Sequence, residues 1–261
     1  MAGARANLRR WQRRYYTLGA AIAPVAPMLF LQGQITRWKV GLLPDAAGPR
    51  EGVALPPTPD SRLKAPDSLF VMGESTVAGL GARTHEEALA GQFAQNLAHH
   101  IDKPVAWQVL GRNGVTARQT INELLPQMPD QQFDYILLGL GGNDVMKLSS
   151  PVRWRRDMLE LLSLVREMQP DAVIFISNCP MIILSPVIPE PSKSLLWQLS
   201  RMHDENIKEF TRDLDRVVYY PQPVGVKLEG FFADGIHPSE QGYADWAAAM
   251  MDHFATRRDK W

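Results

Sequence analysis

From Asp67 onward, short apolar runs alternate with longer segments whose apolar residues recur at helical spacing. Tyr135–Leu138, for example, is continuous and apolar, which is typical of a strand covered on both faces. Strands alternating with helices join through right-handed crossovers into one parallel sheet, so the sequence predicts a parallel α/β sandwich with its reactive groups at the carboxyl ends of the strands. We expect strands at 68–72, 105–110, 135–138, 172–176 and 217–220, and helices at 85–100, 117–128, 152–168, 192–214 and 239–254.

Bulk properties exclude several classes of function. The 261 residues are enough for one domain with an appendage, and a hydrophobic content of 45% supports a real core. Lys plus Arg and Asp plus Glu each number 28, so no broad basic surface is expected and we exclude nucleic-acid binding. Cys179 is the only cysteine, which excludes an intramolecular disulfide, a cysteine zinc cluster and a CxxC redox motif.

The first 40 residues have the pattern of a membrane anchor. Tyr15–Thr36 carries no charge, and a helix of these 22 residues is about 33 Å long, enough to cross a hydrocarbon core. Aromatic residues stand at both of its ends, where membrane interfaces favour them. Arginine excess before the segment predicts the N-terminus inside and the rest of the chain outside, in the periplasm or the exterior. The residues involved are Arg5, Arg9, Arg10, Arg13 and Arg14 before the segment, Arg37 and Lys39 after it, and the aromatic Tyr15, Tyr16 and Trp38.

Two other interpretations of this segment are also consistent with the sequence. Ala21–Ala23 offers a small-residue site at which a signal peptide is cleaved, which leads to a secreted protein. Alternatively, the segment is a helix packed on the domain and kinked by Pro24 and Pro27. Residues 41–66 contain six prolines and three glycines, which argues against regular secondary structure and predicts a semi-extended linker. The chain thus divides into an anchor (1–40), a linker (41–66) and a catalytic domain (67–261).

Three short motifs follow the first three predicted strands. Ser75, in Gly73-Glu74-Ser75, is either a nucleophile at the edge of the sheet or the N-cap of the next helix. Asn113-Gly114 is either a turn or a bare backbone N–H that an oxyanion can approach. In Gly141-Gly142-Asn143-Asp144, Asn143 can aim its amide at developing negative charge, whereas Asp144 is expected to tie the loop together.

A fourth motif precedes the last predicted helix. Asp234 and His237 are three residues apart, so a tight turn can bring both side chains to one side. Asp234 would then hold one imidazole nitrogen while the other faces Ser75, which is the logic of a catalytic triad. The alternative is a turn-capping Asp with a surface His. Pro238 is expected at the first helical position.

The ordered set of Ser, Gly, Asn and Asp-x-x-His resembles the four sequence blocks of the SGNH (GDSL-like) hydrolases over residues 67–254. One departure is Glu74, where the family has Asp. The resemblance implies a three-layer α/β/α sandwich with a parallel, flavodoxin-like sheet, and a hydrolase without metal or cofactor. It also implies Ser75 as nucleophile, His237 as general base and Asp234 as its orienting group. The oxyanion would be held by the backbone N–H groups of Ser75 and Gly114 and the side chain of Asn143.

The expected activity is hydrolysis of carboxylic esters, with short-chain acyl or acetyl esters favoured, on small-molecule, lipid or sugar substrates. A lysophospholipase- or lipase-type activity on membrane lipids is the alternative, and a catalytically weak binding protein on the same fold is the rival, with Glu74 as its warning sign. Apolar residues after the fourth strand either line an acyl pocket or belong to the core: Met181, Ile182, Ile183, Leu184 and Trp197. The sequence specifies neither the acyl group nor the oligomeric state.

Overall fold

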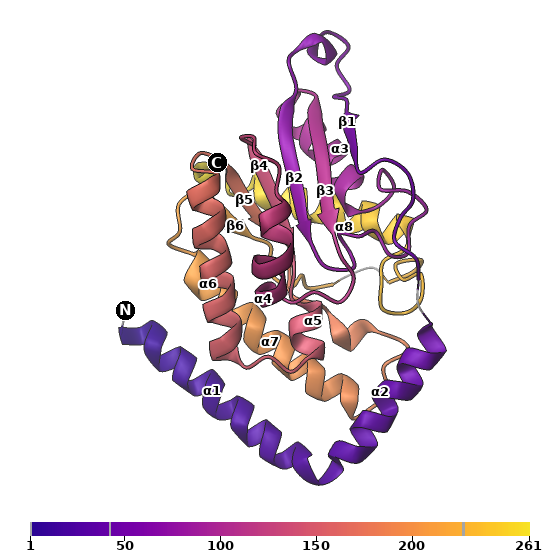
Figure 1. Cartoon of the computed structure of the whole chain (residues 1–261), viewed down its shortest axis with the longest axis vertical. Coiled ribbons are helices and arrows are strands. Elements are labelled where there is room, and N and C mark those ends of the chain that lie inside the picture. The colour runs from indigo at the N-terminus through magenta and orange to yellow at the C-terminus, as the bar shows by residue number, and fades with distance from the viewer. Residues whose placement is uncertain (1, 42, 226–227) are drawn as a thin grey trace.

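A computed structural model describes residues 2–41, 43–225 and 228–261. Within these residues six strands form one sheet in the order β1-β3-β2-β4-β5-β6 (Figure 1). All neighbours are parallel except β1, which pairs antiparallel with β3 at one edge. The five parallel strands thus have a flavodoxin-like order. The strands are β1 (Glu51–Ala54), β2 (Asp67–Gly73), β3 (Val105–Gly111), β4 (Tyr135–Gly139), β5 (Val173–Ile176) and β6 (Val217–Tyr219).

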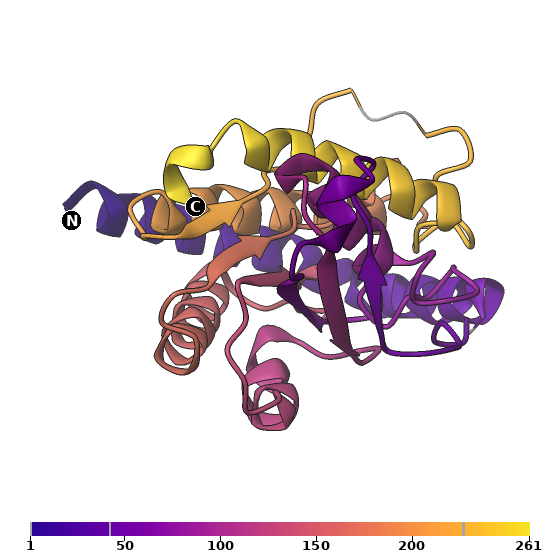
Figure 2. The ribbon, with the colours of Figure 1, turned by 90° about the horizontal axis from the view of Figure 1, so that it is seen from above.

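Helices cover both faces of this sheet (Figure 2). Alternate residues of β2 point to opposite faces, so Val71 packs with α3 and α8 while Met72 packs with α6 and α7. The fold is therefore the expected three-layer α/β/α sandwich. The helices are α1 (Ala2–Ile22), α2 (Ala26–Val40), α3 (Leu89–Ile101), α4 (Ala117–Gln119), α5 (Gly142–Met146), α6 (Pro151–Met168), α7 (Ser192–Thr211) and α8 (Glu240–Ala255).

Several helix boundaries differ from the prediction; α7, for example, ends at Thr211 rather than at Leu214. The segment before α3 forms a turn, in which Thr84 Oγ1 accepts from the N–H of Glu87 at 3.3 Å, and the helix begins only at Leu89. The helix predicted over 117–128 is α4 followed by a π turn and a 3-10 turn that contains Pro126, which lacks an N–H to continue a regular helix. Pro238 precedes α8 rather than starting it, because Ser239 is the N-cap and accepts from the N–H of Gly242.

The expectation that residues 41–66 lack regular secondary structure is wrong, because they contain β1 and a 3-10 turn, Asp60–Leu63. The prolines stand on either side of β1, so residues 51–54 keep their N–H groups and pair with β3. Ala46 and Ala47 also donate backbone hydrogen bonds to the oxygens of Ala78 and Arg83, at 3.0 and 2.9 Å. The segment is therefore fastened to the catalytic domain along its length.

The N-terminal helices α1 and α2 form a V below the sandwich in Figure 1. The bend is a 3-10 turn, Ala23–Val25. Pro24 lies in this turn, and Pro27 is the second residue of α2, directly after it. The stretch Asn7–Thr36 is long and apolar enough to cross a membrane, a test that a signal sequence passes equally well. The side chains of Arg5, Arg37 and Lys39 lie outside the described part of the structure.

Candidate active site

The segment that carries Ser75 crosses directly over the ends of three strands. Gly73, Gly111 and Gly139 end β2, β3 and β4 in the same register. A Cβ on Gly73 would lie 2.0 Å from the oxygen of Gly139, and one on Gly111 would lie 2.2 Å from the nitrogen of Ala78. Only glycine permits this close approach. Residues 75–80 form a turn rather than a helix, so Ser75 acts as no N-cap there and lies at the carboxyl edge of the sheet, almost fully buried.

Glu74 fastens this segment to the loop after β4. Its buried carboxylate accepts hydrogen bonds from the N–H of Gly142 at 2.7 Å, from the N–H of Asn143 at 2.8 Å and from Asn143 Nδ2 at 2.6 Å. A Cβ at position 142 would lie 2.9 Å from Glu74 Oε1, so glycine makes room for the longer acid. Glu74 therefore fixes both the backbone and the side-chain amide of Asn143.

Burial raises the pKa of Glu74 to about 7, and the hydrogen bonds from Asn143 and Gly142 limit the rise. Nearby, burial raises the pKa of Asp144 to about 6. Because the folded pKa of Glu74 lies above its ordinary value of 4.5, the folded chain binds more protons at this group than the unfolded chain between pH 4.5 and about 7. The contribution of Glu74 to stability is therefore greatest below pH 4.5 and is lost as the pH rises through the folded pKa.

The raised pKa of Glu74 predicts how the stability of the protein changes with pH. Between pH 5 and pH 7, the free energy of unfolding of the unmodified chain should fall relative to that of Glu74→Gln by about 2 kcal/mol. Urea unfolding of both proteins at the two pH values measures the difference. Comparing the two proteins cancels the histidines, such as the buried His203, whose lowered pKa acts in the opposite sense. Equal changes with pH in both proteins would show that the Glu74 carboxyl is not held out of water.

Gly114 lies in the loop after β3, and Asn143 lies in α5 after β4. Gly114 has a φ of +85° and open space at its Cα. Lys147 Nζ donates to its carbonyl oxygen at 2.7 Å, and Asp144 Oδ2 accepts from the N–H of Ala117 at 2.9 Å, so α5 holds this loop in place. Asp144 thus ties loops together, as its sequence position predicted. Within the described residues, the backbone N–H groups of Ser75 and Gly114 donate no hydrogen bond to another backbone group.

Asp234 and His237 meet in a closed turn before α8. Asp234 Oδ1 accepts from the N–H groups of Ile236 and His237 at 2.8 and 2.7 Å, and His237 Nδ1 lies 2.8 Å from Asp234 Oδ2. Burial opposes ionisation of Asp234, but the hydrogen bonds from His237 and Ile236 outweigh it and lower the pKa of this carboxyl. The carboxylate therefore stays ionised and orients the imidazole.

Close packing joins this turn to the Ser75 segment. A Cβ on Gly81 would lie 2.1 Å from the oxygen of Pro238. The hydroxyl of Tyr243 on α8 donates to the oxygen of Leu80 at 2.7 Å, and the N–H of Leu80 donates to the oxygen of Ser75 at 3.1 Å. These contacts hold the His237 turn against the loop that follows the serine.

A cavity of about 580 Å³ opens at the same edge of the sheet. Its described lining contains neither Ser75 nor His237, but it contains the chain neighbours of both: Glu74 and Thr76, and Ile236 and Pro238. A volume of this size is typical of ligand pockets. Within residues 2–41, 43–225 and 228–261, no three His, Cys, Asp or Glu side chains gather closely enough to hold a metal ion.

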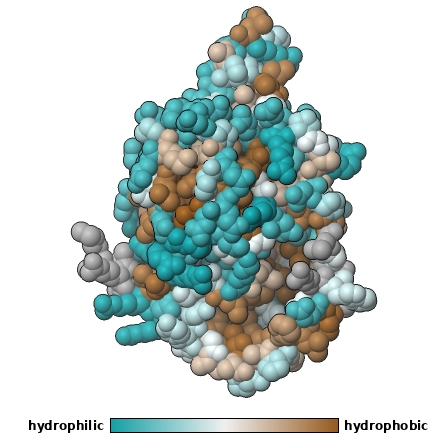
Figure 3. All heavy atoms as spheres, in the orientation of Figure 1, coloured by the Kyte–Doolittle hydropathy of each residue, from teal (hydrophilic) through white to brown (hydrophobic). Residues whose placement is uncertain are grey.

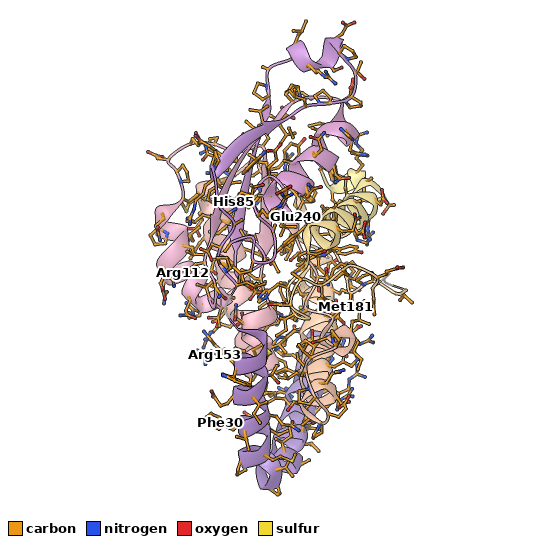
Figure 4. All side chains as sticks on the ribbon, turned by 90° about the vertical axis from the view of Figure 1, so that its right-hand side faces the viewer. Phe30, His85, Arg112, Arg153, Met181 and Glu240 are labelled. Carbon is orange, nitrogen blue, oxygen red and sulfur yellow. The ribbon has the colours of Figure 1, made fainter. Side chains whose placement is uncertain are left out.

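The rest of the cavity is mainly apolar. Met181, which is labelled in Figure 4, lines it together with Ile182 and Leu184, as the sequence had allowed, but its described lining does not include Ile183 or Trp197. Ser185 Oγ donates to the oxygen of Gly235 at 2.7 Å, so this wall is joined to the His237 turn.

Comparison with known proteins places this geometry in a family. A model of the GDSL-like lipase/acylhydrolase family matches residues 71–244. The chain belongs to this family. The matched range includes all four motifs, from the Ser75 segment of this GDSL-like hydrolase to its Asp234–His237 turn.

Individual relatives of the hydrolase are distant. It is 22% identical over 195 residues to thioesterase 1/protease 1/lysophospholipase L1 of Escherichia coli strain K12, a match that covers 73% of this chain and 86% of the relative. A lipase from a goat rumen metagenome has a TM-score of 0.57 at 15% identity, with 72% and 97% of the two chains covered. A family two carbohydrate esterase from Clostridium thermocellum, solved in complex with cellohexaose, has a TM-score of 0.53 at 16% identity, with 76% and 67% covered. These likenesses confirm the fold.

Sequence reasoning missed two positioning groups in this GDSL-like hydrolase. Lys147 follows α5, a helix that was not predicted, and its contact with the Gly114 carbonyl depends on the packing of two loops. The three hydrogen bonds that the Glu74 carboxylate accepts were also not predicted. Gly142, which stands in the motif Gly141-Gly142-Asn143-Asp144, was a signal that another group packs closely against this loop.

Proposed function

We propose that this hydrolase cleaves carboxylic esters with Ser75 as nucleophile, His237 as general base and Asp234 as its orienting group. The observation that carries the proposal is the close packing of the Ser75 segment against the turn that holds Asp234 and His237. At Gly81 the two turns are so close that a side chain would not fit between them, and Tyr243 of α8 donates a hydrogen bond to Leu80 of the Ser75 segment. The cavity next to them is lined by the chain neighbours of both residues, so a substrate bound there would lie beside the proposed triad.

The chemistry follows from the hydrogen bonds. His237 Nδ1 donates to Asp234, which leaves Nε2 as the acceptor for the Ser75 proton. Ser75 Oγ attacks the acyl carbon, and its proton moves to Nε2. His237 then returns that proton to the leaving alkoxide, and the acyl group stays on Ser75. Water, deprotonated by His237, releases the acid and restores the serine. The N–H groups of Ser75 and Gly114 and the amide of Asn143 are our proposed donors to the oxyanion.

The cavity supports an ester with an extended apolar acyl group. Its wall of Met181, Ile182 and Leu184 continues to Phe231 and Trp246, a surface larger than an acetyl group needs. This favours the lysophospholipase- or lipase-type activity over the short-chain and acetyl esters expected from the sequence, and lysophospholipase is part of the name of the Escherichia coli relative. The carbohydrate esterase likeness keeps sugar esters as the second candidate.

The rival binding-protein hypothesis rested on Glu74. Its carboxylate accepts three hydrogen bonds from the Asn143 loop, so the longer acid maintains the connection between the Ser75 segment and the proposed oxyanion donor. This supports an active enzyme.

We also propose that the N-terminal segment places the enzyme at a membrane surface. The support is its apolar length and its arginine-rich flank. A periplasmic or extracellular location, or secretion after cleavage, depends on whether this segment crosses the bilayer or is removed.

A series of p-nitrophenyl esters from acetate to palmitate tests the proposed activity. The full chain and Ser75→Ala are assayed side by side, without added lipid. We expect turnover that is highest for chains longer than acetate and absent from the variant. An optimum at acetate would favour an acetyl esterase, and turnover that persists in Ser75→Ala would exclude Ser75 as the nucleophile.

A further inference from the structure

Both arms of the N-terminal V are fastened to the same domain. On α1, Trp11 is only 7% exposed and packs with Ile182, Leu199 and Met202, while Tyr15 Oη donates to the oxygen of Leu148 at 2.8 Å. The contacts of α1 with the domain therefore extend to Tyr15, the first residue of the uncharged segment.

On α2, the fastening point is Gln32. Its Nε2 donates to the oxygen of Glu190 at 3.0 Å, and its Oε1 accepts from Ser192 Oγ at 2.7 Å. The chain thus leaves the domain along α1, turns at Ala23–Val25 and returns to the domain along α2.

The bend divides the uncharged stretch into two short arms. Tyr15–Ile22 and Ala26–Thr36 are 8 and 11 residues long, which corresponds to about 12 and 16 Å of helix. A hydrocarbon core is about 30 Å thick. Each arm alone is therefore too short to span it.

The exposed side chains have the order expected along a bilayer normal. Near the bend, the apolar side chains of Val25, Met28, Phe30 and Leu31 are 39–70% exposed, and Figure 3 shows hydrophobic residues gathered at the lower end of the molecule, where the V bends. Figure 4 shows Phe30 at this same end. Further from the bend stand two exposed aromatic residues, one on each arm: Tyr16 on α1 and Trp38 on α2.

Cationic side chains follow beyond the aromatic residues of α1. Arg9, Arg10, Arg13 and Arg14 are all exposed, and no acidic residue lies between positions 1 and 44 to balance them. Anionic lipid headgroups beside a hydrocarbon layer match both the arginines and the apolar bend.

We propose that α1 and α2 insert as a bent wedge into one leaflet of an anionic bilayer, with both arms returning to the side on which the catalytic domain lies. The inference deepens the membrane association proposed above and does not depend on the esterase activity. It replaces the spanning topology expected from the arginine excess, because a straight spanning helix would pull Trp11 and Tyr15 off the domain.

Vesicle flotation tests the lipid contact. The full chain is mixed with phosphatidylcholine vesicles that contain either no phosphatidylglycerol or 30% of it. We expect binding to the anionic vesicles that weakens with salt, and at least a tenfold loss of binding in Phe30→Ser/Leu31→Ser. The matched control is Leu63→Ser, a residue 89% exposed in the 3-10 turn between β1 and β2, which should bind like the unmodified chain. Failure to bind either vesicle, or a dimer that forms through the same residues instead, would overturn the proposal.

Cysteine labelling tests the path of the chain. Gly3→Cys and Arg257→Cys are made separately in the full chain, in which Cys179 is buried, and are expressed in cells. Sealed membrane vesicles of one orientation are treated with a membrane-impermeant maleimide. The wedge predicts that both cysteines react from the same face. Reaction from opposite faces would establish a spanning anchor. Ester hydrolysis measured without lipid is unaffected by either outcome, so failure of the wedge and failure of the proposed activity are distinguishable.

Discussion

Replacing His237 with alanine is expected to lower kcat for ester hydrolysis by about 10⁴-fold or more, because no other group would remove the Ser75 proton. Asp234→Asn should cost about as much, since an amide in place of the Oδ2 that accepts from Nδ1 turns the imidazole to the wrong tautomer. The measurement is kcat and KM on the best p-nitrophenyl ester of the series.

The matched control is His99→Ala, which removes an exposed imidazole at the end of α3. It should retain the full rate. The double variant His237→Ala/Asp234→Asn should be no slower than His237→Ala, because the two residues act as one unit. A full rate in His237→Ala would contradict the proposed triad.

Glu74→Gln has the second largest expected effect. The glutamine amide directs two N–H groups toward a site where three donors already converge, so it would repel the N–H of Gly142 or Asn143 and release the Asn143 side chain. We expect kcat to fall by about 10²-fold, the size of a lost oxyanion donor, with a much smaller change in KM.

Asn143→Ala tests whether Glu74 acts through Asn143. It should lower kcat by a similar factor, and combining it with Glu74→Gln should add little, because both changes remove the same donor. Glu51→Gln, an exposed acid on β1, is the control and should be silent. A large additional loss in the double variant would mean that Glu74 supports the site by another route.

Much of the fold was predictable because buried parallel strands have a simple sequence pattern. The continuous apolar run Tyr135–Leu138 lies in β4, and each of the other four predicted parallel strands is present within one or two residues. The Pro-rich segment before β2 concealed β1, because its pairing depends on a long-range match with β3 rather than on local propensity.

The candidate site was predictable only in part. Short motifs at strand ends point to Ser75, Gly114 and Asn143 as candidates, because a parallel sheet brings its carboxyl ends to one edge. Asp234 and His237 are candidates from a motif before the last helix. The cavity was not predictable in shape, since much of its described wall comes from loops without periodicity, at 177–188, 220–225 and 229–232, which pack against α8. The contact of Lys147 with the Gly114 loop likewise depends on tertiary packing.

The proposed nucleophile is tested most directly by covalent capture. The full chain is incubated with diethyl p-nitrophenyl phosphate, an organophosphate that reacts with activated serines, and the modified peptide is identified by mass spectrometry. We predict one diethylphosphoryl group per chain, on the peptide that contains Ser75, together with loss of ester hydrolysis and no such adduct in Ser75→Ala. Inhibition with the adduct on a different residue, or an unmodified Ser75 in a chain that has lost its activity, would contradict the assignment of Ser75 as the nucleophile.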